Sequence, residues 1–172
     1  NRDDDSPLQG MIRTPTTPNG VITDNSIIRM LENSLDDGVL HQYRDQTTGN
    51  GDTEAILPIV KDYWATVSEV WPEAWGLPPR HSRLLHGAGV ISLGLLMDAI
   101  SDKFLEHQAD RRKYFLSDLS ALKPICHWTN GVWEFDNGSV RAWNEVQNIS
   151  NDIELLAEHL LSNYRHLVWR IL

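Results

Sequence analysis

Apolar residues recur at three- and four-residue spacing in five stretches of the chain, and this spacing is typical of amphipathic helices. Polar N-cap residues precede the first stretch at 23–26, and Asp52 or Thr53 caps the second. We therefore expect a mostly α fold, a helical domain of about five helices. The predicted helices cover about 27–37, 53–70, 82–100, 110–122 and 150–171.

The third predicted helix, which begins at Ser82, is apolar nearly all round between Gly87 and Met97. A helix with no polar face is typical of the buried centre of a domain. Its glycines each cost about 1 kcal/mol of helix propensity relative to alanine. We therefore expect neighbouring helices to approach this central helix closely at its small residues.

Three segments lack helical periodicity. Residues 1–22 contain prolines and turn formers, which predict an irregular segment with one short extended piece around Ile12. Residues 44–53 are almost free of apolar side chains, which predicts a flexible loop. Two Asn-Gly pairs lie among aromatic residues after Pro124, and this pattern predicts a short β-hairpin near 128–140.

The chain has 172 residues, a net charge of −9 and one cysteine, Cys126. This length suits a single domain spanning 1–172, and one cysteine excludes a disulfide framework. No apolar run is long enough to span a membrane and no signal peptide is present, so we expect a cytoplasmic protein without membrane partners. The chain begins with Asn rather than Met, which favours the C-terminal part of a longer protein.

The negative charge is concentrated in residues 1–54, and an acidic surface is repelled by the phosphates of nucleic acids. Two basic clusters in the neutral middle of the chain are the candidate anion- or phosphate-binding residues. The first would add charge to the free N–H groups at the start of the central helix. The alternatives are solvated helix ends, or arginines paired with a carboxylate such as Glu73. The clusters are Arg80, Arg83 and His86, and the run Arg111, Arg112 and Lys113.

No catalytic motif is present in the sequence. His81 and His86 are five residues apart and His159 and His166 are seven apart, so neither pair has the spacing of two metal ligands on one helix face. Phosphate-binding glycine loops and a nucleophile elbow are also missing. We predict no metal site, no cofactor and no assigned catalytic residue.

Seven tryptophans are a high number for a chain of this length. Trp64 lies on an apolar helical stripe, which favours core packing. The positions of Trp71, Trp75, Trp128 and Trp133 leave two interpretations open, a core and an exposed binding patch.

Several short strings occur in an order that resembles the C-terminal half of DGQHR-domain proteins. This bacterial group includes the repressor associated with DNA phosphorothioation. The Asp-Gly-Gln-His-Arg motif itself, which lies in the N-terminal region of that family, is missing here, so no residue role carries over from it. The strings are Asp5-Ser6-Pro7, Tyr63-Trp64, WPEAWGLPP, HGAGV, Trp128 to Trp133, and Trp143 to Asn148.

Two hypotheses of function follow. The resemblance implies a non-catalytic helical domain linked to DNA modification or mobile-element biology, which supports DNA binding, regulation or oligomerisation. Its partners would be nucleic acid, through the full-length protein, and further copies of itself. The alternative is an enzyme domain, nuclease-like or nucleotide-processing, with a site around Arg80, Arg83 and His86.

Overall fold

A computed structural model describes residues 3–103 and 110–168, with the side chain of residue 168 excluded. Within this range the mostly α architecture is confirmed. The five α-helices are α1 (Asp24–Asp37), α2 (Thr53–Val70), α3 (Gly87–Ser101), α4 (Arg111–Leu122) and α5 (Ser150–Val168), and short 3-10 helices follow α1 and α4 as η1 (Val39–Tyr43) and η3 (Lys123–Ile125). The end of the last predicted helix, at 169–171, lies outside the described residues.

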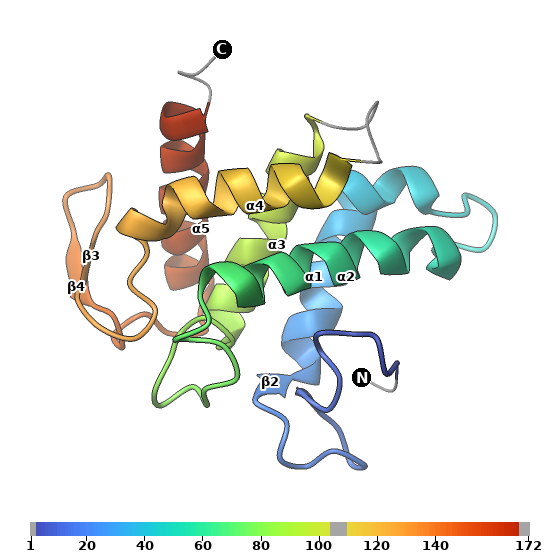
Figure 1. Cartoon of the computed structure of the whole chain (residues 1–172), viewed down its shortest axis with the longest axis horizontal. Coiled ribbons are helices and arrows are strands. Elements are labelled where there is room, and N and C mark those ends of the chain that lie inside the picture. The colour runs from blue at the N-terminus through green and yellow to red at the C-terminus, as the bar shows by residue number, and fades with distance from the viewer. Residues whose placement is uncertain (1–2, 104–109, 169–172) are drawn as a thin grey trace.

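The helices form two layers (Figure 1). In one layer α1, α3 and α5 lie roughly side by side, and both outer helices pack on α3. In the other, α2 and α4 pack together and cross over the first layer. The layers join through one hydrophobic core, in which the hydroxyl of Tyr63 on α2 donates to the carbonyl of Leu93 on α3 at 2.5 Å.

Helix α3 is the buried centre, as its apolar composition predicts. A Cβ atom at Gly94 would lie only 2.2 Å from Cγ of Met30, so this glycine lets α1 approach closely. On the other side, the Ser92 hydroxyl donates to the carbonyl of Ile153 on α5 at 3.2 Å. The glycine that weakens the isolated helix is therefore the position that allows its tight packing in the fold.

Helix α3 begins at Gly87, five residues later than the predicted start at Ser82. Residues 83–86 form bends. The Ser82 hydroxyl accepts the backbone N–H of Leu84 at 3.1 Å, and the backbone N–H of Arg83 donates to the carbonyl of Trp128 at 2.8 Å, so these N–H groups are bonded outside a helix. Leu84 and Leu85 are still buried. Their apolar side chains extend the helical pattern, although the backbone there is irregular.

The predicted hairpin is confirmed as antiparallel strands β3 (Val132–Glu134) and β4 (Val140–Ala142). The N-terminal segment is more ordered than predicted, since β1 (Ile12–Arg13) and β2 (Ile22–Thr23) pair in parallel. Residues 44–53 form a loop closed by a bridge between Arg44 and Gly51. The flexibility of that loop stays a prediction.

A partly buried carboxylate, that of Asp98, joins α1, η1 and α3. Asp98 accepts the Ser34 hydroxyl at 2.5 Å and the Val39 backbone N–H at 3.0 Å. Burial raises the pKa of Asp98 to about 6, against the lowering effect of these hydrogen bonds, and the charges of Asp102 and Asp37 raise it further. The folded protein therefore holds the proton on Asp98 more tightly than the unfolded chain does.

This raised pKa predicts a pH dependence of stability. The stabilising effect of protonated Asp98 is complete below the ordinary aspartate pKa of 3.8, which applies to the unfolded chain, and is lost as the pH rises through about 6. The two pKa values correspond to about 3 kcal/mol of unfolding free energy. Between about pH 4 and pH 6, the unfolding free energy of Asp98→Asn should fall less than that of the wild-type chain. Urea denaturation at several pH values measures both. Exposed Glu134→Gln is the control, and an equal fall in wild type and Asp98→Asn would contradict the assignment.

Candidate functional site

Arg83 is held by backbone carbonyls. Its Nε–H donates to Val146 at 2.9 Å and its Nη2–H to Asn144 at 2.5 Å, while Nη1–H donates to Pro79. The guanidinium also lies 5.9 Å from the ring centroid of Trp143. Arg83 thus ties the turn before α3 to the segment before α5, and these bonds occupy all three nitrogens of its guanidinium.

His86 is the N-cap residue of α3, but its side chain makes no capping bond. Its Nδ1 is buried without a hydrogen-bond partner among the described residues. Burial, with the nearby charge of Arg83, lowers the pKa of His86 to about 4. At neutral pH this imidazole is uncharged, so it adds no positive charge to the start of α3.

Arg80 is exposed, and its Nε–H donates to the ring of His81 at 3.1 Å. The alternative pairing of these arginines with Glu73 is not found, because Glu73 lies 3.5 Å from the ammonium of Lys123. The first cluster is therefore divided among an exposed arginine, a carbonyl-bound arginine and a partly buried neutral histidine.

The second basic cluster forms the first turn of α4. Arg111 donates to Oδ2 of Asp62 on α2 through Nε at 3.0 Å and Nη2 at 2.7 Å. Arg112 lies 3.3 Å from Glu69, also on α2, and Lys113 is exposed. Two of the three basic side chains thus join α4 to α2, which leaves Lys113 as the member of this run without a partner among the described residues.

The tryptophans belong largely to the core. Trp71, Trp128 and Trp133 are at most 3% exposed, and Trp75 is half-buried beside Trp64. Trp128 packs edge-on against Trp71 at 5.9 Å and against Trp133 at 5.1 Å between ring centroids. These contacts resolve the two interpretations in favour of an aromatic core around the hairpin.

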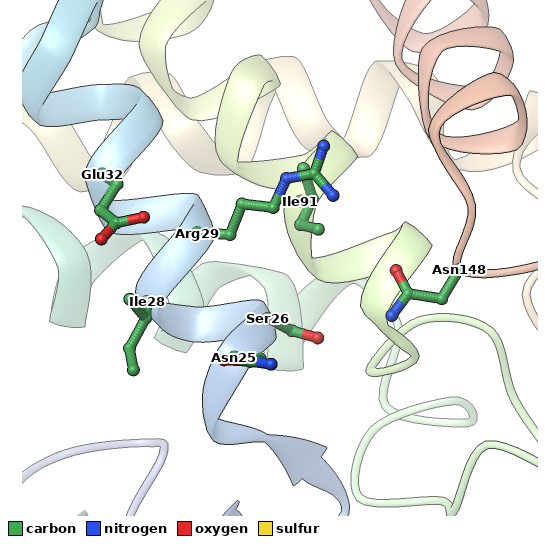
Figure 2. A pocket seen from close by; sticks show the side chains of 7 residues that line it. All are labelled: Asn25, Ser26, Ile28, Arg29, Glu32, Ile91 and Asn148. Atoms are coloured by element: carbon green, nitrogen blue, oxygen red, sulfur yellow. The ribbon is translucent and has the colours of Figure 1, made fainter.

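A second candidate site lies on the surface of α1, α3 and α5 that faces away from α2 and α4. A pocket of about 420 Å³ is lined by residues of α1, by Ile91 of α3 and by Asn148 before α5. Figure 2 shows Arg29 extending from α1 towards Ile91, and Asn148 directed towards the start of α3. Its lining residues are Asn25, Ser26, Ile28, Arg29, Glu32, Ile91 and Asn148.

A neighbouring pocket of about 600 Å³ shares Arg29 and Ile91 with the first. Leu95 of α3 lies between Arg29 on the α1 side and Glu154 and Glu158 on the α5 side. We call the surface lined by both pockets the open face. The full lining of the second pocket is Arg29, Asn33, Ile91, Leu95, Asp136, Ile153, Glu154, Ala157, Glu158, Leu161, Ser162 and Arg165.

The open face collects basic groups that the fold leaves unpaired. Most lysine and arginine side chains in residues 3–103 and 110–168 bond to a carboxylate, a carbonyl or a histidine. In this range three do not: Arg29, Lys113 and Arg165. Two of these, Arg29 and Arg165, line the same pocket. The sequence gives no sign of this, since their helices are far apart in the chain.

Two further properties of the described residues bear on the site. They contain no group of three or more histidine, cysteine, aspartate or glutamate side chains that could hold a metal ion. Among the helices of this range, none combines the length and apolar character needed to cross a membrane. Comparison of the chain with protein-family models, curated proteins and solved structures found no significant match.

The contacts of Arg83 predict a role in stability. Replacing it with alanine removes three hydrogen bonds and leaves the carbonyl of buried Val146 without its donor, so the unfolding free energy should fall by about 2 kcal/mol or more. Exposed Arg80→Ala is the matched control and should change it by about 0.5 kcal/mol or less. Chemical denaturation measures both, and equal stability of the two variants would contradict this role.

Proposed function

We propose that the chain is a non-catalytic helical domain of a DGQHR-like protein linked to DNA modification or mobile-element biology. In this proposal the domain supports DNA binding or regulation by contacting another protein, and it does not itself bind DNA phosphates. The sequence resemblance supplies the biological context. The observation that carries the molecular role is the pairing of the candidate phosphate ligands within the fold.

A side chain that binds phosphate must have donors free to reach it. Each guanidinium nitrogen of Arg83 donates to a backbone carbonyl, and Arg111 and Arg112 bond to carboxylates of α2. Arg80 and Lys113 are exposed, but they lie on different elements of an acidic chain. Of the two basic clusters, only these two scattered cations remain available, and they give little counterion release, which is the main source of non-specific affinity for DNA.

The alternative of an enzyme around Arg80, Arg83 and His86 receives less support from the same geometry. A working site would bring a nucleophile or base together with free donors around one cavity. Here Arg83 is engaged by carbonyls, and neither pocket of the open face is lined by any of the three residues. His86, which is partly buried and uncharged at neutral pH, stabilises no anion by charge.

The proposal predicts that the chain binds duplex DNA weakly and that removing Arg80 and Lys113, the two exposed cations of the basic clusters, does not change this binding. Fluorescence anisotropy of a labelled duplex, titrated with the chain at several salt concentrations, measures both the affinity and its salt slope. We expect Arg80→Ala/Lys113→Ala to leave both unchanged. Each lost phosphate contact would otherwise lower the salt slope by about 0.9. A clear loss of affinity with a shallower slope would overturn the proposal.

The enzyme alternative is tested with the same preparation. Incubation with duplex DNA, single-stranded DNA and nucleoside triphosphates, with divalent cations added, should give no cleavage or hydrolysis above the level of a His86→Ala variant. Activity that disappears in His86→Ala, with its fold checked by circular dichroism, would favour the enzyme.

A further inference from the structure

A third pocket lies where the β-hairpin stands beside α5 (Figure 1). Its volume is about 500 Å³, and residues of β3, of the segment 124–127 and of α5 line it. We call this pocket the hairpin groove. It shares only Asp136 with the lining of the open face, so the two are different surfaces.

Backbone pairing leaves one edge of β3 free. The N–H of Trp143 donates to the carbonyl of Gly131 at 3.1 Å, in register with the strand pairs that follow. In an antiparallel pair, such bonded positions alternate with positions whose N–H and C=O groups point away from the partner strand. Val132 and Glu134 therefore direct these groups away from β4. No other part of the described chain bonds to them.

The hairpin groove runs along this free edge. Val132 and Glu134, which are exposed on the outer face of the hairpin, line it. His159 of α5 also lines it, and this ring packs against Trp133 on the inner face at 5.7 Å between ring centroids. No residue of β4 takes part. A pocket that reaches residues on both faces of the hairpin without contacting β4 must follow the edge of β3.

The charge of the groove is negative. Glu134 is exposed, and its carboxylate has no hydrogen bond or ion pair with a described residue. Asp136 accepts the Ser162 hydroxyl at 2.5 Å. The described residues that line the groove include no lysine or arginine, since Arg165 lines the neighbouring pocket and not this one. Burial lowers the pKa of His159, so its imidazole adds no positive charge at neutral pH.

We propose that an extended, basic segment of a partner protein adds to β3 as a third strand in the hairpin groove, which rests on the proposed role in protein contact. The backbone of this segment pairs with the outward N–H and C=O groups of Val132 and Glu134. Side chains alternate between the two faces of a strand, so every second residue of the segment lies on the same face as Glu134. Lysine or arginine at these positions is attracted by the carboxylates of Glu134 and Asp136.

The same charges disfavour strand pairing between two copies of the chain. Pairing of two β3 edges would bring the Glu134 and Asp136 carboxylates of both copies together, and like charges on neighbouring strands destabilise a sheet. Charged side chains protect free strand edges from self-association for this reason. A basic segment removes the repulsion, so the groups that keep two copies apart favour a partner of opposite charge.

Fluorescence anisotropy with a labelled peptide of alternating lysine and valine tests the groove. We expect the wild-type chain to bind this peptide, and to bind a peptide of alternating glutamate and valine much more weakly. Glu134→Lys places a positive charge beside the groove and should raise the Kd of the lysine peptide about fivefold or more. Glu32→Lys is the matched control, because Glu32 is exposed on α1 and lies outside the groove lining, and it should leave this Kd nearly unchanged.

A second pair of probes separates strand addition from charge attraction alone. N-methylation of the lysine nitrogens in one peptide, and of the valine nitrogens in another, removes N–H groups from opposite edges of the strand and keeps every charge. Strand addition uses one edge of the peptide, so one methylated peptide should bind about tenfold more weakly than the other.

Three results would overturn the proposal: no binding of the lysine peptide, equal weakening by Glu134→Lys and Glu32→Lys, or equal affinity of the two methylated peptides. Circular dichroism establishes that both variants keep their helices. None of these results alters the DNA titration of Arg80→Ala/Lys113→Ala, which tests the proposed function separately.

Discussion

The fold depends on the near-complete burial of α3. Three neighbouring helices each make a close contact with it: Met30 of α1 packs against Gly94, Ile153 of α5 accepts the Ser92 hydroxyl, and Tyr63 of α2 bonds to Leu93. Interiors pack as densely as organic crystals, so a contact this close leaves little freedom in the angle between the helices. The position of the open face follows directly, since α3 is also its floor.

Several basic side chains that the sequence suggests as binding residues instead form hydrogen bonds and ion pairs within the fold. Arg83 donates to carbonyls in two irregular segments, and one of them belongs to buried Val146, where a carbonyl without a donor is costly. Arg111 joins α4 to α2 in the same manner. Charges that remain unpaired after these bonds are better indicators of external partners than charges that are merely close together in sequence.

Local patterns are sufficient to predict much of the fold. Helical spacing locates all five helices, Asp52 caps α2 as expected, and the Asn137-Gly138 turn lies inside the hairpin, with Gly138 at a φ of 81°. The start of α3 is wrong by five residues because Leu84 and Leu85 are buried on an irregular backbone, which apolar spacing cannot distinguish from a helix.

The candidate site is much less predictable. Whether an arginine is free or bonded to a carbonyl depends on which distant segment folds against it, and Arg83 finds its partners beyond the hairpin. The open face combines residues of α1, α3 and α5, and no local spacing relates positions on different helices. Packing alone brings Arg29 and Glu158 to opposite edges of one surface.

Hydrogen exchange of backbone amides, followed by NMR, tests the central claim that α3 is the buried centre of the fold. The amides of Leu93, Leu96 and Met97, whose side chains are fully buried, should exchange only as fast as global unfolding allows. Those of Val132 and Val140, whose side chains are 45% and 61% exposed on the hairpin, should exchange faster. Exchange of the α3 amides at the rate of the hairpin amides would contradict the claim.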